Sequence, residues 1–201
     1  MRDAGVMVSG AATEMHKGAL AGMLRRWKRL DFPGLEIMSL SEEADGWCAR
    51  SALTDGGDEP FGMMCEWRLD HDWRSRSLDL SCFDAAGERA RTIARAGPKS
   101  WRVDGVERPD LEGCEEIDLS ATPFCNGLAL KRLGQQPGEM IALYVLAPAL
   151  SVEPSRQRYE KLGERQWRYV DLGAAKGFTA VLDFDTEGFV RHYEGLFEAL
   201  G

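Results

Sequence analysis

The sequence lacks the short motifs that mark common catalytic and nucleotide-binding sites. It contains no G-x-S-x-G nucleophile turn, no P-loop, no G-x-G-x-x-G segment and no H-E-x-x-H zinc motif. Its cysteines never stand at C-x-x-C spacing, so a structural zinc site is not indicated. We therefore expect a protein that is not an enzyme and that holds neither a metal nor a cofactor.

Long apolar runs and an excess of positive charge are missing as well. No apolar stretch reaches the roughly 18 residues needed to cross a bilayer. Thr13, Glu14, His16 and Lys17 interrupt the segment in which the apolar core of a signal peptide would lie. The net charge of −8 is not the basic footprint that nucleic-acid binding requires. These observations predict a soluble, cytoplasmic protein that neither spans a membrane nor binds nucleic acid.

Cysteine is present in an odd number. The five cysteines are Cys48, Cys65, Cys82, Cys114 and Cys125. An odd count favours buried, reduced thiols over a disulfide framework. No histidine stands near Cys114 or Cys125 in the sequence, so we interpret both as small buried hydrophobic residues rather than nucleophiles.

Most of the chain has the period-two pattern of β-strands. Residues 63–70, 77–82 and 178–184 alternate between apolar and wetter side chains, with turn signals between the runs. The uncharged run 140–147 predicts a central strand that ends before Pro148. Residues 190–200 are compatible with a strand or a terminal helix. Residues 1–24 show no clear period, so we expect an N-terminal extension followed by one domain over 25–201.

One helix is predicted after residue 121. Thr122 is a good N-cap, Pro123 suits the first helical position, and Gly134 stands where a glycine ends a helix. Phe124 and Leu128 share one side of this helix, whereas Leu130 and Leu133 lie nearly opposite. A short helix that is apolar on two sides is expected to be enclosed rather than laid on a surface.

Asp70-His71-Asp72 is the best local candidate for acid–base chemistry. Neighbouring strand residues point to opposite faces, so these three side chains cannot converge within one straight strand. We therefore interpret the cluster as a polar strand end. The six tryptophans are compatible with stacking on sugars, with a lipid pocket, or with an ordinary core.

The segment from Trp101 to Leu133 is the most distinctive part of the chain. It reads W-R-V-D-G at 101–105, L-E-G-C at 111–114, D-L at 118–119, T-P at 122–123, N at 126 and R-L at 132–133. In order and spacing this resembles a bacterial glycolipid-binding family first catalogued as a domain of unknown function, and the resemblance covers about residues 27–201. The chain departs from the family pattern at Cys125, Gly127, Ala129 and Lys131. If those positions touch a ligand, this chain would bind it differently or not at all.

The resemblance implies a mainly β fold, an antiparallel spiral β-roll wrapped around a single α-helix, and a homodimer. It also implies binding of a glycolipid or other lipid, which a cleft of the curved sheet would hold by its apolar part. The candidate head-group contacts are Trp101, Asp118, Asn126 and Arg132. Each also has a structural interpretation, because Asp118 and Asn126 can satisfy backbone groups at the strand-to-helix corner and Arg132 can form an ion pair.

Two other functions remain open from the sequence. One is a dimeric interaction or scaffold protein that has no small ligand. The other is a hydrolase on a calycin-like β scaffold, in which His71 would take part in the chemistry.

Overall fold

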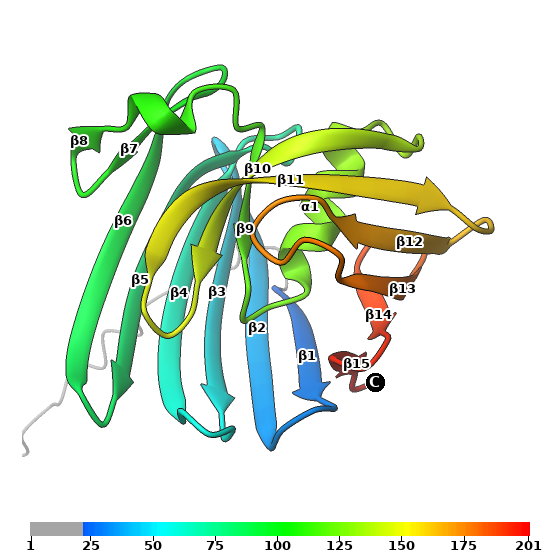
Figure 1. Cartoon of the computed structure of the whole chain (residues 1–201), viewed down its shortest axis with the longest axis horizontal. Coiled ribbons are helices and arrows are strands. Elements are labelled where there is room, and N and C mark those ends of the chain that lie inside the picture. The colour runs from blue at the N-terminus through cyan, green and yellow to red at the C-terminus, as the bar shows by residue number, and fades with distance from the viewer. Residues whose placement is uncertain (1–21) are drawn as a thin grey trace, which may run out of the picture.

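The computed structural model describes residues 22–201, which form one 15-stranded sheet and one α-helix (Figure 1). The expected N-terminal extension lies outside the described residues up to residue 21. The strands are β1 Met23–Arg29, β2 Gly34–Glu43, β3 Gly46–Asp55, β4 Phe61–Leu69, β5 Ser75–Asp84, β6 Gly87–Gly97, β7 Ser100–Val103, β8 Val106–Glu107, β9 Glu116–Leu119, β10 Gly138–Leu146, β11 Ser151–Lys161, β12 Gln166–Asp171, β13 Thr179–Phe184, β14 Val190–Tyr193 and β15 Phe197–Ala199. The helix α1 is Phe124–Arg132, and a short 3-10 turn covers Pro109–Leu111.

The sheet is a spiral whose two ends do not meet. Strands β8 to β1 follow one another in reverse chain order, β1 pairs with β15, and the order then runs back from β15 to β9. All neighbours are antiparallel except β9 and β10, which α1 connects. Parallel neighbours need such a crossover because a tight turn cannot join them. The predicted spiral β-roll around a single helix is confirmed, with this one parallel pair as a refinement.

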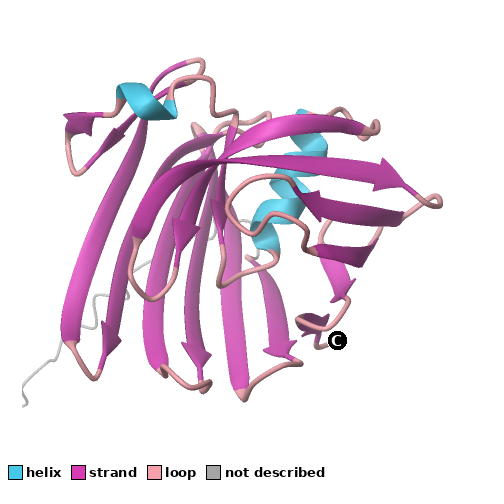
Figure 2. Ribbon diagram, in the orientation of Figure 1, coloured by secondary structure: helices cyan, strands magenta, loops and turns pink. Residues whose placement is uncertain are grey.

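Helix α1 lies between the two halves of the sheet. Figure 2 shows it enclosed between the wall that contains β1–β6 and the strands β10–β13 that pass over it. The Phe124 ring meets Trp67 of β4 edge-on, with 5.4 Å between ring centroids, and stacks at 6.1 Å on Phe189, which precedes β14. Phe124 therefore joins both halves through one aromatic core.

Most of the strand predictions are confirmed. The apolar side of the first run is buried in β4, as the residues Met63, Cys65, Trp67 and Leu69 show. The alternating run 77–82 lies within β5, and the run 178–184 corresponds to β13, which begins one residue later. The run at 140–147 forms β10, which ends before Pro148 but lies one strand from the edge of the sheet rather than at its centre. Residues 190–200 contain two short strands and no helix.

The ends of α1 follow the predicted chemistry with a shift of one residue. Pro123 is the N-cap, so the helix starts at Phe124. The Thr122 hydroxyl still accepts a hydrogen bond from the Phe124 backbone N–H at 3.2 Å and donates one to the buried Glu36 carboxylate at 2.6 Å. Gly134 has a φ of +60°, the left-handed conformation that ends many helices.

Gly127→Ala is expected to destabilise the protein although alanine is the better helix former. A Cβ at Gly127 would lie 2.6 Å from the Gly188 carbonyl oxygen, which is backbone and cannot rotate away. In an open helix the same change stabilises by about 1 kcal/mol, whereas forced overpacking costs about 1–3 kcal/mol. We expect urea denaturation to show a net loss of about 1–2 kcal/mol. A more stable variant would show that α1 and the Gly188 loop are not in close contact.

Candidate functional site

The structure separates the four predicted head-group contacts. Trp101 is 1% exposed in β7, and its indole N–H donates to the Cys114 carbonyl at 3.0 Å. The Arg95 guanidinium covers its ring at 4.1 Å. Trp101 therefore packs against other parts of the same chain and has no open aromatic face.

Arg132 lies at the other end of α1 from the remaining candidates. Its guanidinium donates to the Asp72 carbonyl, and its Nε lies 3.7 Å from the carboxylate of the buried Glu116. Burial lowers the pKa of Arg132 and raises the pKa of Glu116. The Glu116 carboxylate also accepts the backbone N–H of Ser75 at 3.2 Å. Arg132 thus forms an ion pair within the chain, which is the structural interpretation that the sequence allowed for it.

Asp118 and Asn126 do come together, at a hollow of about 210 Å³ beside the start of α1. We call this the tyrosine hollow; six of its polar and aromatic lining residues are Asp118, Asn126, Tyr144, Tyr169, Asp171 and Tyr193. The side chain of Asp118 accepts hydrogen bonds from Cys125 Sγ at 2.9 Å and from the Gln157 amide. Cys125, one of the departures from the family pattern, therefore supports this site directly.

All four tyrosines of the chain gather around Asp118. Tyr159 accepts a hydrogen bond from the Asn126 amide at 3.1 Å, and its ring lies 5.5 Å from that of Tyr169. Burial, followed by the nearby Asp118 carboxylate, raises the pKa of Tyr144 to about 12 and shifts the other three tyrosines upward. Their hydroxyls therefore stay neutral and can both donate and accept hydrogen bonds near neutral pH.

Asp171 is the second carboxylate of the tyrosine hollow. It accepts the Tyr169 hydroxyl at 3.1 Å and the Gly173 backbone N–H at 2.7 Å. Burial raises the pKa of Asp118, and the charge of Asp171 raises it further. Asp171 and the tyrosines were not predicted from the sequence, because they come from four different strands, β10, β11, β12 and β14.

The rim of the tyrosine hollow is apolar and exposed. Phe178 and Leu196 belong to its apolar lining, and the backbone N–H of Leu30 donates to the Leu196 carbonyl at 2.9 Å. Phe178 and Leu30 are 37% and 41% exposed. A polar, aromatic hollow thus opens onto apolar side chains.

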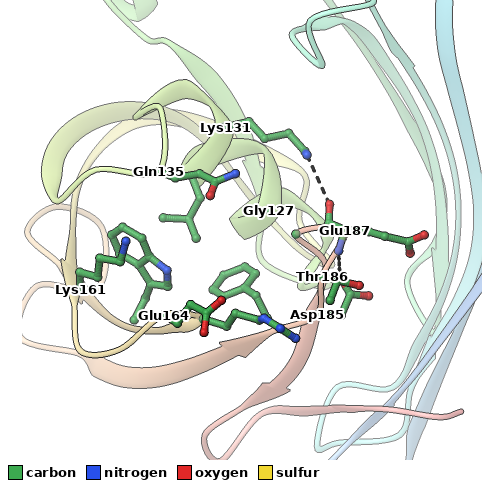
Figure 3. A pocket seen from close by; sticks show the side chains of 13 residues that line it. Gly127, Lys131, Gln135, Lys161, Glu164, Asp185, Thr186 and Glu187 are labelled. Atoms are coloured by element: carbon green, nitrogen blue, oxygen red, sulfur yellow. Dashed lines mark hydrogen bonds between the residues drawn. The ribbon is translucent and has the colours of Figure 1, made fainter.

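A second hollow, of about 420 Å³, lies at the C-terminal end of α1 (Figure 3). We call it the helix-end hollow. Leu130, Trp167 and Phe184 form its apolar part, and charged side chains surround them. Figure 3 shows Lys131 and Gln135 on one side, with Lys161 and Glu164 on the opposite side.

The space between the helix and the sheet is filled by side chains. Trp67, Phe124 and Leu128 are at most 1% exposed. An apolar ligand cannot lie along this part of α1 without displacing the core. The tyrosine hollow and the helix-end hollow, one at each end of α1, are therefore the candidate binding sites next to the helix.

The Asp70-His71-Asp72 cluster forms a turn after β4. The Asp70 carboxylate accepts hydrogen bonds from the backbone N–H groups of Asp72 and Arg74, both at 2.9 Å, and His71 is exposed in this turn.

All five cysteines are free and buried, as expected. Within residues 22–201 no cluster of histidine, cysteine and acidic side chains has the arrangement of a metal site. In the same residues no helix is long and apolar enough to span a bilayer.

The fold defines a class of protein, the spiral β-roll in which one long sheet wraps around a single helix. The sequence profile of the family described as "Putative glycolipid-binding" matches residues 24–199, and the chain belongs to this family. The crystal structure of a DUF1089 family protein from Pseudomonas aeruginosa is similar, with 32% sequence identity and a TM-score of 0.72. The similarity covers 82% of this chain and 92% of that protein. No curated protein is significantly similar to the chain.

Proposed function

We propose that the protein binds a glycolipid without catalysing a reaction, and that the tyrosine hollow holds its sugar head group. The observation that carries this proposal is the convergence of Asp118, Asp171 and neutral tyrosines on one partly enclosed hollow. Carboxylates accept hydrogen bonds from sugar hydroxyls, and tyrosines offer both an apolar ring face and a hydroxyl. Family membership supports the same ligand class.

The size of the tyrosine hollow limits which part of the ligand it takes. Its volume of about 210 Å³ is below the roughly 300–1,000 Å³ of sites that enclose drug-sized ligands. It therefore suits a sugar ring and not a whole glycolipid. The acyl chains would lie outside, along the exposed apolar side chains of Phe178 and Leu30.

A titration with an alkyl glucoside below its micelle concentration tests the proposal. We expect saturable binding to the wild type, weakened about tenfold in Asp118→Asn, because a charged acceptor for sugar hydroxyls is lost. Asp79→Asn, on an exposed position of β5, is the matched control and should bind like the wild type. The alkanol of the same chain length should bind more weakly than the glucoside.

Native mass spectrometry of protein purified from its host gives an independent check. We expect a co-purified glycolipid of defined mass. Equal binding of glucoside and alkanol, or a clean protein that takes up no lipid from a host extract, would contradict the proposal.

A dimeric interaction protein is the second candidate, supported by an apolar patch on the outer face of the sheet. Leu35, Ile37, Met64 and Phe83 are 40%, 44%, 57% and 59% exposed on β2, β4 and β5. Cross-strand pairing places them in two rows of the same face: Ala52 lies between Ile37 and Met64 in one, and Thr54 and Gly62 lie between Leu35 and Phe83 in the other. We propose that two copies associate through this patch, as exposed apolar patches commonly mark interfaces.

Sedimentation equilibrium tests that association. We expect a dimer for the wild type and a monomer for Met64→Asp, with an unchanged circular dichroism spectrum. A wild-type monomer at all accessible concentrations would exclude the dimer.

We also propose that the protein comes from a bacterium and that it is located in the cytoplasm. The relative is from Pseudomonas aeruginosa. Five free, buried thiols fit a compartment that keeps cysteines reduced.

A further inference from the structure

We propose that the helix-end hollow is a second binding site, which takes the phosphate group of an organic phosphate. The proposal does not depend on the sugar site. Three cations line the hollow, namely Lys131, Lys161 and Arg165. None of the three forms an ion pair with another residue of 22–201. This distinguishes them from many arginines of the sheet, which pair with carboxylates of the same or adjacent strands.

Two of the three carboxylates in the hollow share one cation that lies outside its lining. Arg25 of β1 forms an ion pair with Glu187 and lies 3.6 Å from Asp185. The Asp185 carboxylate also accepts the backbone N–H groups of Glu187 and Phe189 at 2.9 Å each. Glu164 is the third carboxylate of the lining. Lys131, Lys161, Arg165 and Arg25 together exceed the three carboxylates by one positive charge, and Glu164 is the one of these carboxylates that has no other partner in the described part of the chain.

Lys131 lines the hollow with a partly buried side chain. Its Nζ lies 4.8 Å from the centre of the Trp73 ring and donates to the Glu187 carbonyl at 3.4 Å. Burial, followed by the charge of Arg132, lowers the pKa of Lys131. A half-buried ammonium whose partners are a carbonyl and a ring is stabilised when an anion approaches.

The C-terminal end of a helix normally repels anions, but here the last carbonyls are occupied. The carbonyls of Ala129, Leu130 and Lys131 accept the backbone N–H groups of Leu133, Gln135 and Gly134 at 2.9–3.1 Å. These bonds follow from the left-handed turn at Gly134 and Gln135. The partial negative charge of the helix end is therefore partly satisfied within the chain.

The charge and shape of the hollow together select the ligand class. A phosphate monoester carries about −1.5 to −2 charges near pH 7, so it is attracted by the net positive charge of the hollow and by three cations that have no ion pair in the described residues. A volume of about 420 Å³ leaves room for an organic group beside the phosphate, against the edge of Leu130, Trp167 and Phe184. Lysines bind phosphate as point charges and do not require the planar geometry of an arginine pair.

A titration with phenyl phosphate, followed by backbone amide NMR shifts, tests this site. We expect saturable binding with shifts at residues 127–135 and 161–167. Lys131→Gln and Lys161→Gln should each raise the dissociation constant about tenfold. Lys99→Gln removes the same charge from an exposed lysine of the β6–β7 turn and is the matched control. The thermal midpoint and circular dichroism spectrum of each variant establish that it is folded.

Three results would overturn the proposal: no saturable binding of phenyl phosphate or inorganic phosphate, shifts confined to other regions, or equal weakening by Lys99→Gln. The source of the phosphate is distinguished with vesicles of phosphatidylcholine, with and without phosphatidic acid. Binding only to the vesicles with phosphatidic acid, reduced in Lys161→Gln, indicates a lipid head group. Binding of phenyl phosphate without vesicle binding indicates a free organic phosphate.

Discussion

Glu36→Gln is expected to stabilise the protein at pH 8 by about 3 kcal/mol, with little effect at pH 4.5. Glu36 is 2% exposed under the start of α1, and burial raises its pKa from 4.5 to about 7. The folded state therefore binds a proton that the unfolded chain has released between those pH values. The stability that this proton provides is complete below pH 4.5 and is lost as the pH rises through about 7. Glutamine keeps the acceptor for the Thr122 hydroxyl but carries no charge.

Urea denaturation of both proteins between pH 4.5 and pH 8 measures this effect. The difference between wild type and variant should grow with pH and level off above the pKa of Glu36. Glu42→Gln, at an exposed position of the same strand, is the control and should follow the wild type throughout. A difference between Glu36→Gln and wild type that does not change with pH would show that Glu36 does not titrate in this range.

Phe124→Ala is expected to lower the free energy of unfolding by about 4 kcal/mol, within the usual range for a large aromatic side chain removed from a core. Phe124 is 1% exposed and contacts Trp67 from one half of the sheet and Phe189 from the other. Its loss removes buried apolar area and leaves a cavity where the two halves meet. Thermal and urea denaturation of wild type and variant at one pH measure the change.

Phe32→Ala is the matched control for this prediction. Phe32 is 42% exposed, so its removal should cost less than about 1 kcal/mol. A Phe124→Ala variant as stable as Phe32→Ala would mean that α1 does not connect the two halves of the sheet.

Local patterns in the sequence predict local parts of this fold. The alternation at 63–69 gives the buried face of β4, since a side-chain period of two is a property of a single strand. Thr122, Pro123 and Gly134 mark both ends of α1 to within one residue, because caps act on neighbouring backbone groups. The parallel pairing of β9 and β10 does not follow from either segment alone. It depends on where α1 returns the chain.

The candidate site was predictable only where its residues are close in sequence. Asp118 and Asn126 come from the strand and helix on either side of one corner, and they meet. Trp101 and Arg132 belong to the same distinctive segment, yet β7 and the far end of α1 place them elsewhere. The tyrosines at 144, 159, 169 and 193 belong to four strands, so only the rolled sheet brings them together.

The tyrosine hollow is the proposed sugar site, and a crystal structure of the protein with a short-chain alkyl glucoside tests this most directly. The predicted result is a sugar ring in the hollow within hydrogen-bond distance of Asp118 or Asn126, with the alkyl chain directed towards Phe178 and Leu30. A glucoside bound elsewhere while the tyrosine hollow holds no sugar, or an alkyl chain inserted between α1 and the sheet, would contradict it.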